Sequence, residues 1–114
     1  MKSIVSKPWG TYQVLEEASN YLIKRIVVSP NGKLSLQSHS NRSEHWIVVH
    51  GTAQVTINEQ IKTLKTNHNI FIPVNTKHRL ANNSQLPLVV IEVWYGDILD
   101  ENDIIRYDDI YNRS

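Results

Sequence analysis

Hydrophobic and polar residues alternate along most of this chain with the two-residue period of β-strands. Between residues 52 and 58, Ala53, Val55 and Ile57 alternate with threonine and glutamine, as in a strand that buries one face. The segments 21–28 and 88–95 are apolar at positions of both parities, which indicates burial on two sides. Strands are expected at 21–28, 33–39, 45–50, 52–58, 61–64, 69–72, 78–81 and 88–95.

Turn residues separate these segments at short intervals. Ser29-Pro30-Asn31-Gly32 stops the segment 21–28, and Asn58-Glu59-Gln60 predicts a tight turn. No segment keeps a 3.6-residue period, so we expect roughly eight or nine short strands in an all-β sandwich or barrel. The tail from Asp97 to Ser114 is acidic and aromatic, and we expect a short helical turn or an arm there.

Length and composition narrow the class of protein. A chain of 114 residues predicts one domain, residues 1–114, large enough to bury a core without a disulfide or a structural metal. The lack of cysteine excludes disulfides, zinc–thiolate sites and thiol catalysis. No apolar stretch has the length of a signal peptide or a membrane span, so we expect a soluble, cytoplasmic protein. With 12 basic and 11 acidic residues, the chain has no charge excess that would favour nucleic acid or membrane as a partner.

One polar cluster carries candidate chemistry. Gln37 and His39 are two residues apart, so on a strand they point to the same face. Glu44 follows a polar turn, and an antiparallel hairpin brings it back beside them, while His78 follows another turn much later in the chain. Two imidazoles, a carboxylate and an amide oxygen suit a divalent ion such as zinc, cobalt, iron, nickel or manganese. The remaining histidines are interpreted as structural: His45, His50 and His68.

The segments that hold these residues resemble the two motifs of the cupin family of small β-barrels. The first motif is a glycine, a His-x-His pair, a glutamate and a closing glycine; here Gln37 replaces the first histidine and Gly51 closes the motif. The second motif resembles Pro73-x-Asn75-x-x-His78-x-x-x-Asn82, with Asn75 at a turn position that suits a positive φ. The resemblance implies a cupin double-stranded β-helix, or jelly roll, with one metal site.

Longer stretches resemble the type II phosphomannose isomerases over almost the whole chain, from about residue 7 to residue 113. In most of that family the barrel is the C-terminal part of a bifunctional enzyme whose other part makes GDP-mannose. This chain has no room for that nucleotidyltransferase, so we expect a stand-alone isomerase or an isolated cupin domain, with a separate nucleotidyltransferase as a candidate partner. The matching motifs are Lys7-Pro8-Trp9-Gly10-x-Tyr12, Lys24-Arg25-Ile26, residues 34–46, Gly51-Thr52-Ala53, Ile72-Pro73, Lys77-His78-Arg79-Leu80, Ile91-Glu92-Val93 and residues 101–111.

The resemblance implies interconversion of mannose 6-phosphate and fructose 6-phosphate, in which a proton moves between C2 and C1 through an enediol. One divalent metal ion, with zinc the first choice, would stabilise the developing enediolate. Glu92, a carboxylate between apolar strand residues, is the candidate base if it faces the interior; the alternative is that it pairs with a cation such as Lys24. Lys24 and Arg42 are candidates for binding the substrate phosphate. Arg79 is a candidate for stabilising the enediolate, although alternation turns it away from His78 unless the strand bends.

Two other functions stay open at this point. The set His39, Glu44 and His78 is also the two-histidine, one-carboxylate triad of non-haem iron oxygenases, although Gln37 would fill a position that such an enzyme keeps open. The second is a non-catalytic metal-binding cupin that binds a sugar phosphate or sugar nucleotide, since Ser40-Asn41 stand where the family often has histidines. We also expect a homodimer that buries an apolar sheet face. The tryptophans are assigned to the core or to an interface: Trp9, Trp46 and Trp94.

Overall fold

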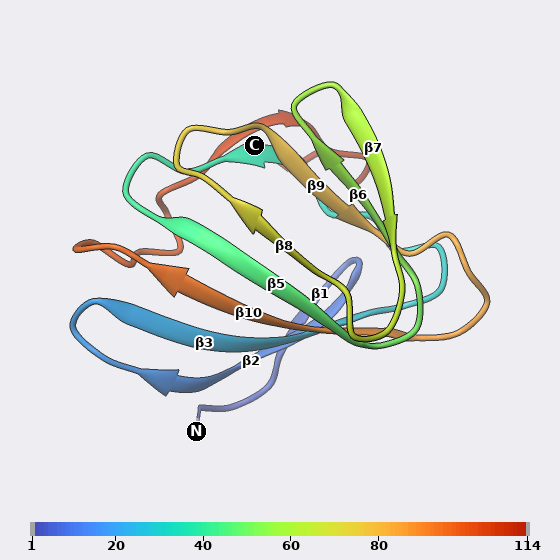
Figure 1. Ribbon diagram of the computed structural model, residues 1–114, viewed down its shortest axis with the longest axis horizontal. Coiled ribbons are helices and arrows are strands. Elements are labelled where there is room, and N and C mark those ends of the chain that lie inside the picture. The colour runs from blue at the N-terminus through green and yellow to red at the C-terminus, as the bar shows by residue number, and fades with distance from the viewer. Residues whose placement is uncertain (1, 114) are drawn as a thin grey trace.

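The structure, a computed structural model, describes residues 2–113, and every regular element in that range is a β-strand (Figure 1). The strands in chain order are β1 (Val5–Lys7), β2 (Gly10–Glu17), β3 (Tyr21–Val28), β4 (Leu36–Ser38), β5 (Ser43–His50), β6 (Ala53–Ile57), β7 (Gln60–Leu64), β8 (Asn69–Ile72), β9 (His78–Ala81), β10 (Leu88–Tyr95) and β11 (Ile105–Asp108). The prediction of an all-β fold is confirmed.

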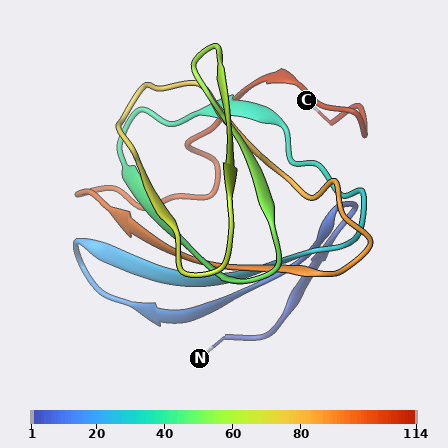
Figure 2. The same cartoon turned by 45° about the vertical axis from the view of Figure 1, so that its right-hand side comes forward.

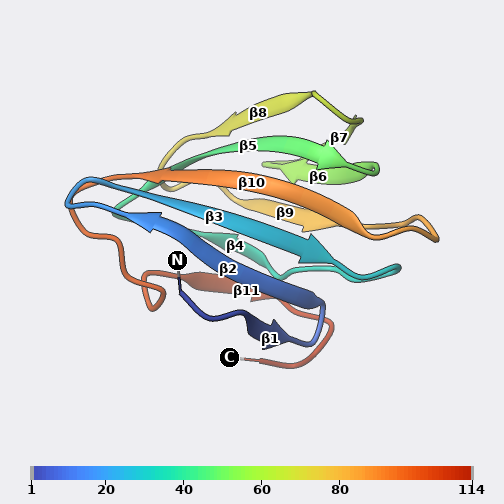
Figure 3. The same cartoon turned by 90° about the horizontal axis from the view of Figure 1, so that it is seen from below.

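Two antiparallel sheets face each other across a common interior. One sheet has the order β1-β2-β3-β10-β5-β8, and the other has the order β11-β4-β9-β6-β7. Figure 3 shows these two layers from the edge. The chain passes repeatedly from one sheet to the other, as from β5 to β6 and from β8 to β9. This connectivity makes a jelly-roll barrel whose interior is lined by both sheets.

One end of the barrel interior is a closed apolar core. On β10, Val90 lies opposite Ile26 of β3 on one side and opposite Val48 of β5 on the other. The second sheet contributes Val55 and Leu80, both fully buried, to the same cluster. Branched side chains on alternate positions therefore fill this end and fix which face of each strand points inward.

Two residues further along the same strands, the inward-facing positions include charged residues beside tryptophans. Glu92 follows Val90 on the inner face of β10 and lies opposite Lys24 of β3 and Trp46 of β5. Trp94 lies opposite Glu44 in the next row. All five of these side chains are buried. Buried charges are costly unless they are paired or functional, so the strand pattern itself places a site at this end of the barrel.

The tail forms a strand and an arm instead of a helical turn. From the end of β10 the chain returns as β11, which pairs with β4 at the edge of the second sheet, as Figure 2 shows for the red segment. The arm part of the prediction is thus confirmed, and the helical turn is wrong. The predicted strand 33–39 is also shorter than expected, because only Leu36–Ser38 is a strand and Lys33 makes an isolated bridge to Ala81.

Strands β1 and β2 were not predicted from the sequence, and for β2 the reason is local. The pairing of β2 with β3 shifts register between Val14 and Glu16. Such a bulge reverses the inside–outside alternation partway along the strand, so no continuous two-residue period is left to detect. By contrast, the turn predictions hold, since Asn58 and Asn75 both have positive φ, at 53° and 58°.

The outer face of the larger sheet is only partly covered. The outward-facing Ile23, Ile91 and Val93 are half-buried, and Ile47 and Phe71 are exposed. Burial on two sides, expected for 21–28 and 88–95, is therefore incomplete within one chain. No helix within residues 2–113 has the length and hydrophobicity to cross a membrane.

Candidate metal centre

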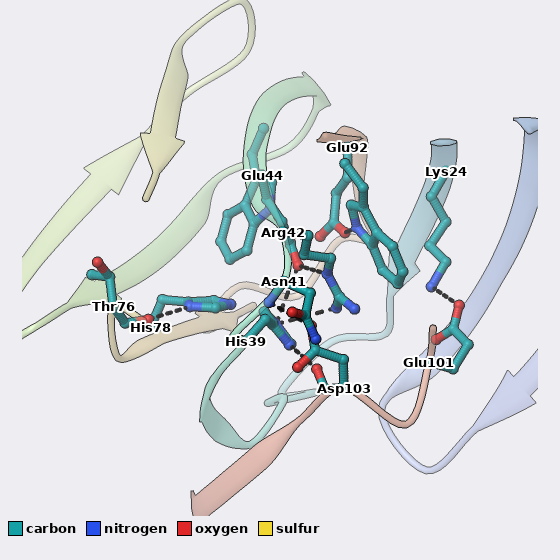
Figure 4. Close-up of polar contacts among 12 residues, drawn as sticks. Lys24, His39, Asn41, Arg42, Glu44, Thr76, His78, Glu92, Glu101 and Asp103 are labelled. Carbon is teal, nitrogen blue, oxygen red and sulfur yellow. Dashed lines mark hydrogen bonds and ion pairs between the residues drawn. The ribbon is translucent and has the colours of Figure 1, made fainter. Parts of the chain in front are cut away.

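Three buried side chains from separate parts of the chain converge at the polar end of the barrel. His39 follows β4, Glu44 lies near the start of β5, and His78 is the first residue of β9. One ligand atom from each lies within 4.8 Å of the others. Figure 4 shows the two imidazoles and Glu44 grouped on one side of Arg42. The hairpin that was expected to return Glu44 to His39 does so, and the turn 73–77 delivers His78.

The outer nitrogens of both imidazoles are held by main-chain oxygens. His78 Nδ1 donates to Thr76 O at 2.8 Å, and His39 Nδ1 donates to Asp103 O at 2.7 Å. Each bond places the ring proton on Nδ1 and leaves Nε2 with its lone pair facing inward. His78 Nε2 is buried with no hydrogen-bond partner among the described residues. A buried acceptor without a partner, beside a carboxylate and a second imidazole, fits a divalent ion.

Burial and neighbouring charges keep the two imidazoles neutral and Glu44 ionised, as metal binding requires. It lowers the pKa of His39 to about 4, against the raising effect of Glu44, and it also lowers the pKa of His78. Burial on its own raises the pKa of Glu44, but Arg42 and the two imidazoles outweigh it and hold that pKa below its usual range. At neutral pH the site therefore offers two neutral imidazoles and one carboxylate, the forms that bind metal ions.

Gln37 is the fourth residue of the predicted ligand set, and its role as a ligand stays a prediction. It lies on β4 two residues before His39 and opposite His78 of β9. Gln37, His39 and Glu44 line one cavity beside this group. The donor set of two imidazoles, a carboxylate and an amide oxygen suits a borderline divalent ion, without selecting one element among zinc, cobalt, iron, nickel and manganese.

Arg42 lies directly against the metal ligands. Its Nε donates to Glu44 Oε2 at 2.8 Å, and its Nη2 donates to His39 Nε2 at 3.2 Å. Its guanidinium carbon is 3.3 Å from the centre of the Trp94 ring. Gly96, after β10, packs so closely on this turn that a Cβ there would come 2.1 Å from Asn41 O. Arg42 is therefore a neighbour of the candidate metal site, with much of its hydrogen-bonding capacity used inside the protein.

A cavity of about 220 Å³ opens beside the ligands. Glu92 lines it, and burial together with the nearby Glu44 raises the pKa of Glu92 to about 8. The indole nitrogen of Trp94 donates to Glu92 at 3.0 Å, and that of Trp46 donates to Glu44 at 2.8 Å. These two tryptophans, expected only as core or interface residues, thus also hold the carboxylates of the site. Lys24, the proposed alternative partner of Glu92, lines the cavity too and bonds to Glu101.

Arg79 does not join this group. Its Nε donates to Leu34 O at 2.8 Å, and its Nη2 donates to Asp108 Oδ2 at 2.8 Å. It is opposite Thr56 in the pairing of β9 with β6, and it is not among the residues that line the cavity. The strand does not bend after His78, so alternation sends Arg79 to the other face. The catalytic role predicted for Arg79 is therefore corrected to a structural one, in which it ties β11 to the barrel.

The C-terminal arm supplies contacts that the sequence pattern did not reveal. The Asp103 carboxylate accepts hydrogen bonds from Ser40 N and Asn41 N, at 3.0 and 2.9 Å, and so holds the turn between His39 and Glu44. The arm also contributes Glu101 and Arg106 to the cavity wall. The available signal was the match of residues 101–111 to the same family motifs that hold the metal ligands.

Comparison with known proteins agrees with this architecture. The family model described as mannose-6-phosphate isomerase C-terminal matches residues 1–109. The chain is 48% identical over 110 residues to the alginate biosynthesis protein AlgA of Pseudomonas syringae, which covers 96% of this chain and 23% of AlgA. It is 46% identical over 109 residues to the mannose-1-phosphate guanylyltransferase ManC of Salmonella typhimurium, which covers 96% of this chain and 23% of ManC. The chain thus spans about a quarter of the length of these relatives.

Solved structures show the same fold at low sequence identity. KdgF from a Halomonas species has a TM-score of 0.78 at 12% identity, covering 89% of this chain and 90% of KdgF. An RmlC-like cupin from Shewanella frigidimarina has a TM-score of 0.76 at 18% identity, covering 88% and 86% of the two chains. The cupin fold is confirmed, and the chain belongs to the mannose-6-phosphate isomerase C-terminal family.

Proposed function

We propose that this chain is a metal-dependent aldose–ketose isomerase that interconverts mannose 6-phosphate and fructose 6-phosphate. The observation that carries the proposal is the position of Glu92. A buried carboxyl with a raised pKa lines one small cavity together with His39 and Glu44, two members of the triad that His78 completes. Proton transfer between adjacent carbons needs such a base beside a Lewis acid.

The chemistry divides among the side chains of the cavity. Gln37, His39, Glu44 and His78 would hold a divalent ion, which would supply Lewis acidity to the substrate oxygens. Glu92 takes the proton from one carbon and returns it to the other. A carboxyl pKa near 8 makes Glu92 a stronger base than an ordinary glutamate, and the positive charge of a bound ion would lower that pKa toward neutral pH. Trp94 fixes the carboxyl through its indole N–H.

The charge of the cavity wall supports an anionic substrate. Five basic side chains line it against three acidic ones, before the charge of any metal is counted. The basic residues are Lys7, Lys24, Arg42, Arg106 and Arg113, and the acidic residues are Glu44, Glu92 and Glu101. A phosphate ester suits such a surface better than a neutral sugar does.

A non-catalytic cupin that binds a sugar phosphate or sugar nucleotide is the second candidate. The observation in its favour is Arg42, which covers ligand atoms of both His39 and Glu44. The absence of histidines at positions 40 and 41 is weaker support for the non-catalytic binder than the sequence suggested. Both of those side chains are exposed and neither lines the cavity, so a histidine there would not reach the substrate without a change in the turn.

The deciding experiment is a coupled assay of mannose 6-phosphate conversion. The protein is stripped with chelator and then given zinc, cobalt, manganese, nickel or iron. Turnover that returns with metal and is lost in His78→Ala supports the isomerase. His45→Ala is the control, because His45 is exposed on the other face of β5 and bonds to Asn69. Oxygen consumption with iron and no isomerisation would favour the oxygenase chemistry of the same triad. A folded, metal-loaded protein without either activity would favour the binder.

Three further expectations extend this proposal. A cytoplasmic enzyme would meet sugar phosphates where they are made. A homodimer would cover the half-buried outer face that includes Ile91 and Val93, and the exposed Ile47 beside them. A separate nucleotidyltransferase would be a functional partner. Size-exclusion chromatography with light scattering tests the dimer directly.

A further inference from the structure

The ammonium group of Lys24 is enclosed at the end of the cavity away from the metal ligands. The Lys24 side chain is only 4% exposed. Its Nζ lies 4.0 Å from the centre of the Tyr12 ring and 3.9 Å from the centre of the Trp94 ring. Two aromatic faces stabilise the charge in part, but a cation removed from water also requires an anion nearby.

The anion that pairs with Lys24 is a half-exposed side chain of the C-terminal arm. Glu101 Oε2 lies 2.7 Å from Lys24 Nζ, and the Glu101 side chain is 51% exposed. Glu101 sits in a turn of the C-terminal arm, outside any strand. Glu92 is opposite Lys24 in register, but within residues 2–113 the carboxylate that reaches hydrogen-bond distance of Lys24 is that of Glu101. A half-exposed glutamate gains little from such a pair and loses little on leaving it, whereas a bare buried Lys24 would be costly.

Arg113, on the same cavity wall, shows the contrast. Its partner Asp109 has a side chain only 3% exposed. Asp109 also accepts hydrogen bonds from the main-chain nitrogens of Tyr111 and Arg113. That carboxylate is fixed by its own turn and cannot easily be replaced. The Lys24–Glu101 pair is the one of these two in which the anion can be exchanged.

We propose that Lys24 is the anion subsite of the cavity and that Glu101 is its exchangeable counterion, displaced by the phosphate of the ligand. The inference rests on the proposed function only in taking the ligand to be a sugar phosphate. In Figure 4 the pair lies on the opposite side of Arg42 from His78. Trp94 connects the two ends, since its ring contacts both Arg42 and Lys24. An open-chain sugar phosphate would place its phosphate at Lys24 and its carbonyl end at the metal.

Binding measured without metal tests the subsite independently of catalysis. Isothermal titration calorimetry of the chelated full chain with inorganic phosphate, and then with mannose 6-phosphate, compares wild type with Glu101→Gln. Glutamine keeps the size of the side chain and removes the competing charge. If Glu101 occupies Lys24 most of the time, its neutralisation should tighten binding by about three- to tenfold. Lys24→Met, checked for folding by circular dichroism, should lose binding by about tenfold or more.

The matched control is Glu17→Gln. Glu17 pairs with Lys2 at 2.7 Å with both side chains well exposed, and it is not among the cavity residues, so binding should not change. Unchanged or weaker binding in Glu101→Gln, or no phosphate binding by any variant, overturns the inference. Tighter phosphate binding without turnover under any metal would leave the anion subsite standing and reject the isomerase. Turnover with an unchanged KM for mannose 6-phosphate in Glu101→Gln would support the isomerase and reject the anion subsite.

Discussion

The Nδ1 atom of His39 lies 2.7 Å from the main-chain oxygen of Asp103, a residue 64 positions further along the chain. The same residue caps the turn after His39 with its carboxylate. One residue of the C-terminal arm therefore fixes both the tautomer of His39, a candidate metal ligand, and the loop that carries it. Outer partners of this kind orient metal ligands and raise their basicity.

Asp103→Asn should weaken metal binding. An amide offers one acceptor oxygen in place of two, so the turn after His39 loses a hydrogen bond, and the main-chain oxygen of residue 103 that orients His39 is held less firmly. We expect a loss of about 10- to 100-fold in affinity, measured by the visible spectrum of bound cobalt or by competition with a chelator. Asp108→Asn is the control, because Asp108 lies in the same arm but bonds to Arg79 outside the cavity. Equal losses in both variants would indicate a general loosening of the arm.

Glu92→Gln should abolish most turnover while it leaves the metal bound. Removal of a general base costs about 10²- to 10⁴-fold in kcat. In the wild type, kcat/KM should rise with pH, because only the carboxylate accepts a proton and its pKa is raised. The pH–rate profile and the metal content are measured together. A variant with the same rising profile as the wild type would exclude Glu92 as the base.

The stability of the metal-free protein should fall as the pH rises from about 6.5 to about 8. The pKa of Glu92 is raised from 4.5 to about 8, so the folded state holds a proton that the unfolded state has released. The stability that this proton supplies is full below pH 4.5 and is lost as the pH rises through about 8. His39 acts the other way, since its lowered pKa costs stability only as the pH falls below 6.5.

Only Glu92 of these two therefore contributes to the slope above pH 6.5. It should reach about 1.4 kcal/mol per pH unit in the free energy of unfolding, followed by urea denaturation in chelator. Glu92→Gln should flatten the curve in this range. A slope that persists in the variant would assign it to another group.

Arg79→Met should destabilise the fold without changing the metal site. It leaves Leu34 O and Asp108 O without their donor, and we expect a loss of about 1–3 kcal/mol in the free energy of unfolding. The chelator competition and the KM for mannose 6-phosphate should match wild type within error. A large loss of kcat in a fully folded, metal-loaded variant would restore the catalytic role first predicted from the sequence.

Local pattern was sufficient for the fold class and for the three residues that converge as candidate metal ligands, His39, Glu44 and His78. The alternation along 52–58 and the turn residues around it depend only on residues one or two positions apart, so they are visible in the sequence itself. The same holds for Gln37 and His39, whose spacing places both on one face, and for Asn75, whose positive φ the turn required.

Pairings between distant segments were decided only by the tertiary structure. The bulge in β2 removes its period, and β11 is a strand only because the edge of β4 is available to it. In the sequence, Arg79 and Arg42 were both candidates for contact with an anionic substrate. In the structure, Arg79 bonds to Asp108 outside the cavity, and Arg42 bonds to Glu44 inside it. Sequence alone thus determined the all-β class and, through the family resemblance, the cupin barrel and the grouping of His39, Glu44 and His78, because these depend on spacing along the chain. The arm over the cavity, with Glu101 on Lys24 and Asp103 on His39, depends on contacts across more than 60 residues that no local pattern encodes.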